Sequence, residues 1–118
     1  MRLTALLGKV TRGAQALPTH QILQMATLNG AIALGIEKQT GSLTVGKAAD
    51  ITAIDFSDLS LTPCFNPLSH LIYVASREHV SHVWVNGRLL LNQGELVTLN
   101  EAELIECSQY WQNRITSK

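Results

Sequence analysis

Four histidines are the side chains in this 118-residue sequence with the widest capacity for chemistry. His79 and His82 lie three positions apart, and histidine is a common ligand of zinc. In a β-strand, however, positions at an odd spacing point to opposite faces of the sheet. The two imidazoles would therefore converge on a metal only if residue 79 lay in a turn. Glu78 is the only carboxylate close by in sequence, so we expect solvated surface histidines rather than a metal site.

The remaining histidines and two aspartates offer no better arrangement for catalysis or metal binding. His20 falls in the first turn of an expected helix, where a positive charge would oppose the helix dipole, so we expect a neutral polar group. His70 is expected to be a hydrogen-bonded residue at the edge of the core. Asp50 and Asp55 flank one expected strand at a spacing of five, so they face opposite ways and cannot act together on one substrate. Asp50 is expected to bond the backbone of the preceding turn.

Nucleophilic catalysis finds no support in the sequence either. The serines and cysteines form no nucleophile elbow and no Cys/His signature. Cys64 and Cys107 stand far apart, as expected of reduced thiols. Trp84 and Trp111 are better explained as packing anchors than as platforms for stacking bases. The sequence therefore predicts no catalytic, cofactor-binding or metal-ligating residue within these positions.

The segment from Gly41 to Ile51 contains the start of a phosphate-binding pattern, GxxxxGK. Ala48 occupies the position at which such a loop needs Ser or Thr to hold magnesium. A phosphate-binding loop also follows a strand and precedes a helix, whereas here a helical segment precedes and residues 50–55 alternate like a strand. We therefore interpret the segment as a tight glycine turn that leads into a strand.

Composition favours one folded domain with few surface charges. Apolar residues make up 46% of the sequence, charged residues 15%, and the formal net charge is zero. This balance excludes disorder and gives no reason to expect nucleic acid or an anionic membrane as a partner. Gly8 and Lys9 interrupt the N-terminal apolar run and no stretch reaches the length of a membrane span, so we expect a soluble, cytoplasmic protein. So uncharged a surface indicates that another protein surface covers part of it.

Hydrophobic periodicity predicts two helices at the start of the chain. Residues 2–12 carry apolar side chains at helical spacing and end before Gly13. A second helix is predicted from position 18 or 19 to Leu34, with Gly35 in the left-handed position after its end. Three small residues on one side of this helix should let a neighbour approach closely: Ala26, Gly30 and Ala33.

Downstream of the glycine turn, the sequence predicts a small antiparallel sheet. Residues 50–55 form one strand, and residues 66–72 can form a brief helix. Residues 80–85 and 88–91 are joined by Asn86-Gly87, the preferred pair for a two-residue type I′ hairpin turn. The hairpin is expected to place two valines on one face and an imidazole and an indole on the other: Val83 and Val85, then His82 and Trp84.

The end of the chain is expected to add one more strand and a helix. Gly94 permits a turn before a strand over residues 96–99. Asn100 is the expected N-cap of a helix that begins at about Glu101, with Glu103 completing an approximate capping box. One stripe of this helix is predicted to dock on the rest of the domain: Leu104, Ile105, Ser108, Trp111 and Ile115.

Several segments resemble consecutive signatures of one enzyme superfamily. Residues 26–35 resemble the A-T-x-N-G-A-x-A-L-G signature of metal-dependent amidohydrolases. Residues 41–51 resemble the G-S-L-x-x-G-K-x-A-D-[IL] segment that follows it, and residues 83–88 resemble its V-x-V-x-G-[RK] hairpin. Residues 66–73 resemble the block between them. Residues 1–9 resemble the preceding helix in one branch, that of triazine chlorohydrolases and methylthioadenosine/S-adenosylhomocysteine deaminases.

The resemblance implies an α+β fold with two N-terminal helices, a small antiparallel sheet and a C-terminal helix. Residues 1–35 would be closing helices of an incomplete TIM-type barrel, and residues 36–118 would be the C-terminal part of a composite β-sandwich with a terminal helix. In this superfamily the metal is held by an H-x-H pair, later histidines and an Asp that all lie upstream of the matched segments. The resemblance thus implies no cofactor in this segment, and zinc or another divalent metal in the parent enzyme.

The function that the resemblance implies is that of a non-catalytic C-terminal segment. Its parent would be a hydrolytic deaminase or chlorohydrolase acting on C–N or C–halide bonds of purine- or triazine-like substrates. The alternative is a free-standing interaction or assembly module derived from that fold. A small independent hydrolase with its own His and Asp residues is disfavoured, because no site is visible. Exposed apolar faces and unpaired strand edges are expected to drive self-association.

Overall fold

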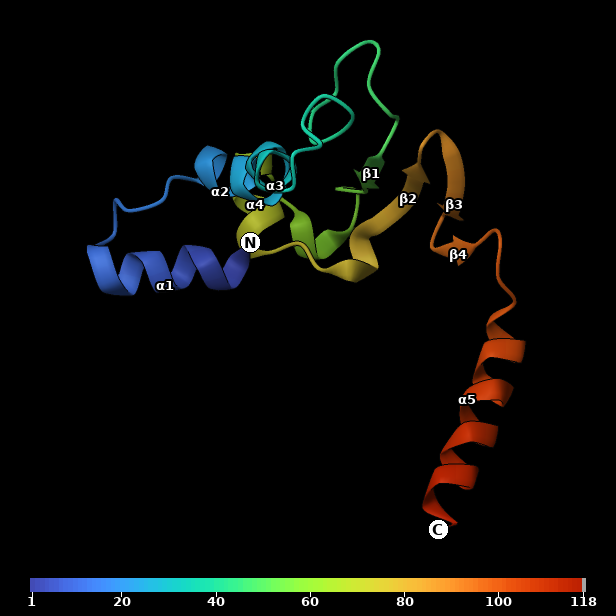
Figure 1. The fold of residues 1–118 in the computed structure, drawn as a ribbon. Coiled ribbons are helices and arrows are strands. Elements are labelled where there is room, and N and C mark those ends of the chain that lie inside the picture. Colours follow the sequence, from blue (N-terminus) through green and yellow to red (C-terminus); the bar gives the residue numbers. More distant parts are fainter. Residues whose placement is uncertain (118) are drawn as a thin grey trace.

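A computed structural model describes residues 1–117, which form a group of short helices beside a small sheet, with a longer helix projecting from the sheet (Figure 1). The helices are α1 (Arg2–Arg12), α2 (Thr19–Ala26), α3 (Leu28–Ala33), α4 (Pro67–Tyr73) and α5 (Glu101–Thr116), with two single 3-10 turns, η1 (Leu59–Leu61) and η2 (Arg77–His79). The strands are β1 (Ile51–Ile54), β2 (Val80–Val85), β3 (Arg88–Asn92) and β4 (Glu95–Leu96). This confirms the predicted α+β architecture.

A buried apolar cluster joins α1, α2 and α4. Ala5, Ile22 and Ile72 are almost inaccessible to solvent and pack together, with Leu17 and Tyr73 against them. Asn66 caps α4 by accepting a hydrogen bond from Ser69 N at 3.0 Å, as the predicted helix start requires. The apolar side chains that give α1 its helical spacing are exposed: Leu3, Leu6, Leu7 and Val10. The helix therefore contacts its neighbours through its small residues.

The predicted second helix is wrong in one respect, because it is divided into α2 and α3 at Thr27. Thr27 leaves helical geometry, with φ −124° and ψ −96°. Its hydroxyl donates to Leu23 O at 2.7 Å, which gives the chain a side-chain bond to the preceding turn at the point where the backbone departs. The predicted C-terminal end is confirmed, since Gly35 has φ +71° and Ile36 N donates back to Ala31 O at 3.0 Å.

Within residues 1–117, the predicted stripe of small residues is not the side of α2 and α3 that a neighbour approaches. Ala26 and Ala33 are exposed. Ala31 is buried instead, because Gly41 of the following loop lies against it: a Cβ built on Gly41 would come within 2.7 Å of Ala31 Cβ. Small residues do allow a close approach here, but on a different side of the helix.

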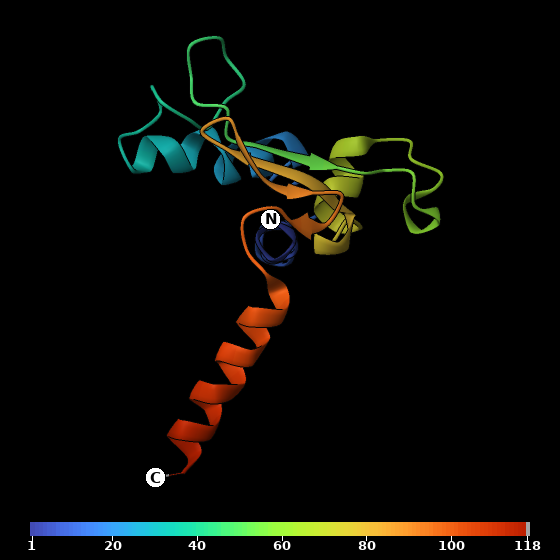
Figure 2. The ribbon, with the colours of Figure 1, turned by 90° about the vertical axis from the view of Figure 1, so that its right-hand side faces the viewer.

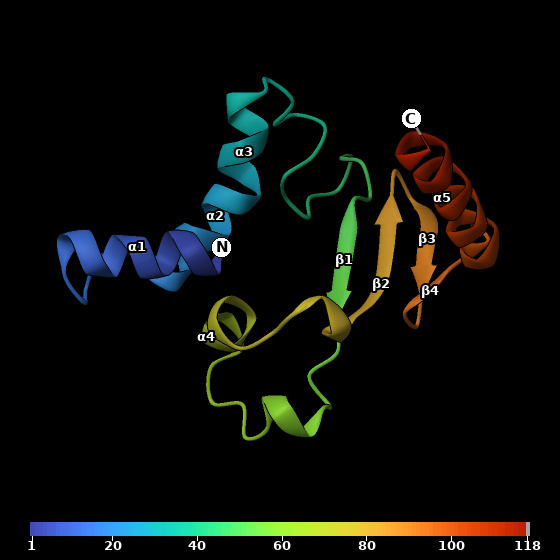
Figure 3. The ribbon, with the colours of Figure 1, turned by 90° about the horizontal axis from the view of Figure 1, so that it is seen from below.

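The strands form one antiparallel sheet in the order β1-β2-β3-β4 (Figure 3). The predicted hairpin is confirmed, with φ +50° at Asn86 and φ +75° at Gly87 between β2 and β3. The predicted faces are also confirmed, because the rings of His82 and Trp84 stack with centroids 5.3 Å apart. No residue of the four strands is fully buried, so the sheet contributes little to a closed core within the described chain.

The last strand is shorter than predicted. β4 covers only Glu95 and Leu96 rather than residues 96–99. Gln93 and Gly94 form the turn before it with positive φ, and β4 pairs with β3 directly after this turn. The last backbone hydrogen bond between the two segments comes from Val97 N. The chain then leaves the sheet to begin α5 at its cap.

The predicted cap of α5 is confirmed, but its predicted docking is wrong. Asn100 Oδ1 accepts from Ala102 N at 3.0 Å, and its amide donates to Glu103 Oε1 at 3.1 Å. Figures 1 and 2 show α5 projecting away from the helices and the sheet. No residue of α5 is buried within residues 1–117, and Trp111 is 50% exposed. None of the helices described combines the length and hydrophobicity needed to cross a membrane.

Candidate functional site

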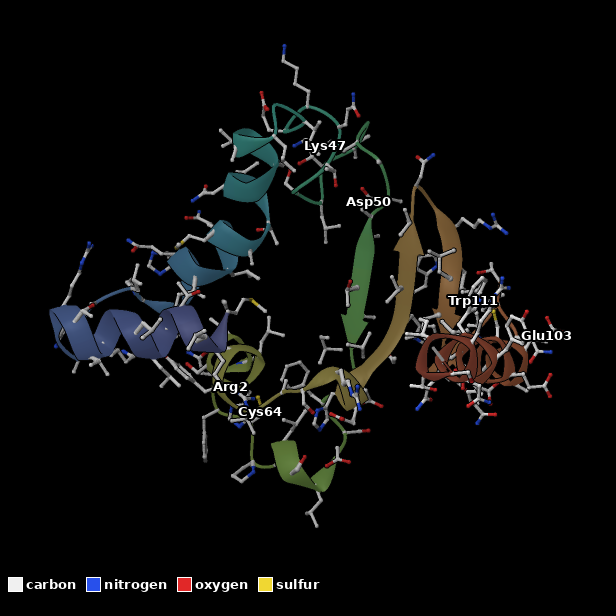
Figure 4. The ribbon with its side chains drawn as sticks, turned by 60° about the horizontal axis from the view of Figure 1, so that its bottom comes forward. Arg2, Lys47, Asp50, Cys64, Glu103 and Trp111 are labelled. Carbon is white, nitrogen blue, oxygen red and sulfur yellow. The ribbon has the colours of Figure 1, made fainter. Side chains whose placement is uncertain are left out.

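The lysine of the GxxxxGK segment is turned inward on its own loop (Figure 4). Lys47 Nζ donates to the carbonyl oxygen of Glu37, to Thr40 O at 3.4 Å and to Ser42 Oγ at 2.8 Å. The backbone closes the same loop, with Ala48 N donating to Gln39 O at 2.8 Å. The ammonium is therefore occupied by loop acceptors, which agrees with the interpretation of this segment as a structural turn rather than a phosphate site.

Asp50 joins this loop to the hairpin of the sheet. Its Oδ2 accepts from Thr40 Oγ1 at 2.7 Å, and its Oδ1 accepts from Asn86 N at 2.7 Å. The prediction that Asp50 bonds the backbone of the preceding turn is therefore wrong: the backbone partner is the turn between β2 and β3, which tertiary pairing brings alongside. The bonds from Asn86 and then from Thr40 hold the pKa of this carboxyl below its ordinary value of 3.8.

A second polar cluster surrounds His79, which lies in η2 and not in the strand. Its Nε2 is 3.1 Å from Ser60 Oγ, and its Nδ1 is 3.1 Å from Ser76 N. The imidazole thus connects η1 to the turn that leads into β2. His82, on β2 itself, stacks on an indole and places its Nδ1 3.0 Å from Ser81 Oγ.

Three carboxylates stand around His79, and each is bound by a serine. Asp55 accepts from Ser57 N at 2.8 Å and Asp58 accepts from Ser60 N at 2.7 Å. The Ser57 N–H lowers the pKa of Asp55, and the Ser60 side chain and then its N–H lower the pKa of Asp58. Glu78 accepts from the Ser76 hydroxyl, which with the bond from Arg77 lowers its pKa to about 2. All three carboxylates are therefore ionised at neutral pH, and two of them, Asp55 and Glu78, line an open surface hollow.

This cluster cannot act as a nucleophile and base. The nitrogen Nδ1 of His79 accepts from a backbone N–H, so the proton of the neutral ring lies on Nε2 and donates to Ser60. In this tautomer Nε2 has no lone pair with which to remove the Ser60 proton. Nor does the donor set fit a metal, because both ring nitrogens are engaged and no group of three or more His, Cys, Asp or Glu within residues 1–117 is arranged to hold an ion.

The other candidate side chains lie where their elements place them. His20 is exposed in the first turn of α2, and His70 Nδ1 lies 3.2 Å from Asn66 O, which confirms its predicted hydrogen-bonded position. Cys64 and Cys107 are exposed thiols. Trp111 does not anchor α5 within the described chain; instead it meets the guanidinium of Arg114 at 5.3 Å.

The role of His79 was not foreseen from the sequence, although a signal for it exists. Ser76 and His79 stand at the spacing of a capping box, S-x-x-E/Q, directly before an apolar strand. The pattern normally has Glu or Gln at its last position, and the histidine concealed it. The inward direction of Lys47 had no comparable signal, since its acceptors are mainly backbone carbonyls.

Comparisons with known proteins agree with the motifs. The profile of the Amidohydrolase family matches residues 1–90. A 5-methylthioadenosine/S-adenosylhomocysteine deaminase of Teredinibacter turnerae is 42% identical over all of this chain, and a 5'-deoxyadenosine deaminase of Methanosarcina barkeri is 44% identical over 92% of it. The matches cover 27% and 25% of those two proteins.

Solved structures give the same picture. An adenosine deaminase from Xanthomonas campestris with bound zinc superimposes on 99% of this chain with a TM-score of 0.94 and 41% identity, over 27% of its own length. An atrazine chlorohydrolase from Arthrobacter aurescens with zinc covers 92% of the chain with a TM-score of 0.84 and 26% identity, over 24% of its length. The chain thus spans about a quarter of the proteins it matches. With its profile match over residues 1–90 and its fold shared with these enzymes, the chain belongs to the amidohydrolase family.

Proposed function

We propose that the chain is the C-terminal structural part of a metal-dependent hydrolytic deaminase acting on adenosine-type nucleosides. The observation that carries this proposal is the graded similarity: deaminases match at 41–44% identity, whereas the chlorohydrolase matches at 26%. A halide-releasing activity on triazine-like compounds is therefore the weaker choice.

A supporting role for the segment follows from its packing. Only five apolar residues are buried among the described ones, and none of them lies in the sheet. Burial of apolar surface is the main favourable term in folding, so a chain with such open faces gains much from a further surface. We propose that residues 1–35 close a barrel and that residues 36–118 complete a sandwich, each against residues of the same enzyme outside this chain.

The metal of the proposed parent would be held elsewhere. The side chains described here do not fit an ion, since the two nitrogens of His79 are occupied and no cluster of donors is formed. The matched Xanthomonas and Arthrobacter structures contain zinc, which supports zinc or another divalent ion in the whole enzyme. The contribution of this chain would be to hold the barrel ends and the sandwich in place.

A chimera tests the proposal directly. In the deaminase of Teredinibacter turnerae, the quarter matched by this chain would be replaced by residues 1–118, and ammonia release from 5'-deoxyadenosine and methylthioadenosine would be measured. We expect a soluble, zinc-binding chimera with activity close to that of the parent. The 118-residue chain alone, supplied with zinc, should release no ammonia above a metal-only blank.

Matched chimeras control for simple misfolding. Gly41→Ala should impair the chimera, because it disturbs the contact with Ala31, whereas Gly46→Ala at an open position should impair it less. A chimera that folds and binds zinc yet shows no deaminase activity would contradict the supporting role. Turnover by the isolated chain would also contradict the supporting role, because the chain would then be catalytic by itself.

A further inference from the structure

The nitrogen Nδ1 of His79 lies 3.1 Å from two different atoms of Ser76, the backbone N and the side-chain Oγ. One ring nitrogen carries either a lone pair or a proton, so it can accept from the N–H or donate to the hydroxyl oxygen, but not both. We propose that His79 is a proton-dependent cap of the η2 turn, and that its charge decides which of the two Ser76 atoms it binds.

In the neutral state the imidazole acts like the Glu or Gln of an ordinary capping box. Its Nδ1 lone pair accepts from the Ser76 N–H, while Nε2–H donates to Ser60 Oγ at 3.1 Å. A carboxylate at this position would accept from the N–H over the whole neutral range. An imidazole accepts only while it is uncharged, and histidine is the side chain that changes charge between about pH 5 and pH 8.

In the charged state both ring nitrogens are donors. Nδ1–H then points to Ser76 Oγ, whose own hydroxyl already donates to Glu78, so a chain of hydrogen bonds runs from the imidazolium to the carboxylate. Nε2–H keeps its bond to Ser60. The Ser76 N–H is the one group that loses its partner, and no large movement of the ring is needed.

The charged and titratable groups around the ring come from several elements. Asp55 follows β1, Asp58 precedes η1 and Glu78 lies in η2 beside the imidazole. Arg77 opposes them, but it is paired with Glu78 at 3.1 Å, and the ring of His82 on β2 faces the same hollow. Each of the three carboxylates already accepts a hydrogen bond from a serine.

The cap matters because η2 connects the helical group to the sheet. Ser76 follows α4 closely, η2 runs directly into β2, and His79 O accepts from Asp55 N at 2.8 Å at the end of β1. Release of the Ser76 N–H loosens the entrance to this turn while the bonds to Ser60 and Asp55 persist. Acidification would therefore loosen one side of the junction between α4 and β2 and leave the other side attached.

Nuclear magnetic resonance of the 15N-labelled full chain tests the proposal. Between about pH 5 and pH 8, the Ser76 amide resonance should move with the same midpoint as the His79 ring nitrogens. Its hydrogen exchange, corrected for the intrinsic pH dependence, should speed up by roughly 2- to 10-fold on acidification, as expected for loss of one hydrogen bond. A Ser76 amide that does not respond while His79 titrates, or a His79 that does not titrate in this range, would overturn the proposal.

Two variants make the test specific. His79→Gln retains an uncharged acceptor at the capping position, so its Ser76 amide should be independent of pH over the same range. Glu78→Gln retains an acceptor for the Ser76 hydroxyl, so its Ser76 amide should still respond to pH. A pH response of Ser76 that survives in His79→Gln would assign it to another group and overturn the inference.

Discussion

At the scale of single residues, Lys47 stabilises its own loop through hydrogen bonds from its ammonium group. Its ammonium is half-buried among acceptors from three points of one loop: Glu37, Thr40 and Ser42. A lysine ammonium has three donor hydrogens and no acceptor, so this arrangement satisfies it fully. The loop is consequently shaped by one side chain rather than by regular secondary structure.

Replacing Lys47 by Met should therefore destabilise the chain. Met retains the length of the side chain but leaves the loop acceptors without their donor, and hydrogen bonds to charged groups contribute about 1.5–3 kcal/mol each at most. We expect a loss of about 1–3 kcal/mol in the free energy of unfolding, measured by urea denaturation. Lys38→Met, at an exposed lysine of the same region, should change it by less than about 0.5 kcal/mol. Equal effects of the two variants would show that Lys47 does not stabilise the loop in this way.

Asp50 should make the free energy of unfolding depend on pH in the acidic range. Its pKa is lowered in the folded state by the N–H of Asn86 and the hydroxyl of Thr40, so the unfolded chain binds a proton more readily. The stability due to Asp50 is thus fully present above the ordinary aspartate pKa of 3.8 and is lost as pH falls through the lower, folded value. Asp50→Asn should flatten the decline of the urea midpoint below about pH 4. Glu95→Gln, which removes one exposed carboxylate, should retain the wild-type slope.

Which residue contacts could be predicted depends on how local they are. The cap at Asn100 and the shared face of His82 and Trp84 follow from spacing within one element, and the sequence predicts them correctly. The bond from Asn86 to Asp50 joins positions 36 apart, so no local pattern contains it. For the same reason, the link between His79 and Ser60 could not be read from the sequence.

At the scale of elements, the approach of one loop to α3 depends on Gly41. This residue has φ +86°, and an added Cβ would lie 2.7 Å from Ala31 Cβ and 3.1 Å from Leu28 Cα. Gly46, in the same loop, has φ +91° but no atom within 4 Å of an added Cβ. The two glycines therefore separate the cost of backbone conformation from the cost of a steric clash.

Gly46→Ala should cost about 1–2 kcal/mol, the usual penalty for a left-handed conformation. Gly41→Ala should cost about 1–3 kcal/mol more, because the loop or the helix must shift to make room. Thermal and urea unfolding of both variants would check this difference. A Gly41→Ala variant no less stable than Gly46→Ala would show that the loop does not pack on α3 as described.

Element types were predicted better than element ends. Helices, strands and the Asn86-Gly87 turn follow from periodicity and turn chemistry, and all are present. The break at Thr27 and the short β4 are set by how the chain must change direction to reach its next element, which periodicity does not encode. The docking of α5 was wrong because an amphipathic stripe specifies a need for burial but not the surface that meets it.

At the scale of the whole molecule, exposed apolar surface is the dominant feature. Leu3 and Val10 of α1 are 69% and 83% exposed, and α5 shows an uncovered stripe along its length. We propose that these faces are covered by other residues of a larger enzyme and that the chain on its own associates with itself. Patches of this kind mark interaction sites in most soluble proteins.

Sedimentation of the isolated chain should therefore depend on its concentration in the micromolar range. The double variant Leu104→Gln/Trp111→Gln removes two large apolar side chains from α5 and should weaken association at least about tenfold. The control Leu43→Gln/Val45→Gln changes two apolar side chains of the loop before β1 that are even more exposed, and it should have little effect. A clean monomer at every concentration would refute self-association.

The fluorescence of the two tryptophans can report separately on α5 and on the sheet. Trp84 stacks on His82 within the sheet, whereas Trp111 stands on the projecting helix beside Arg114. Emission from Trp111 should therefore shift to shorter wavelength when a partner surface covers α5, while Trp84 follows melting of the sheet. With one tryptophan replaced by Phe at a time, fluorescence would distinguish docking of α5 from unfolding of the sheet without any added label.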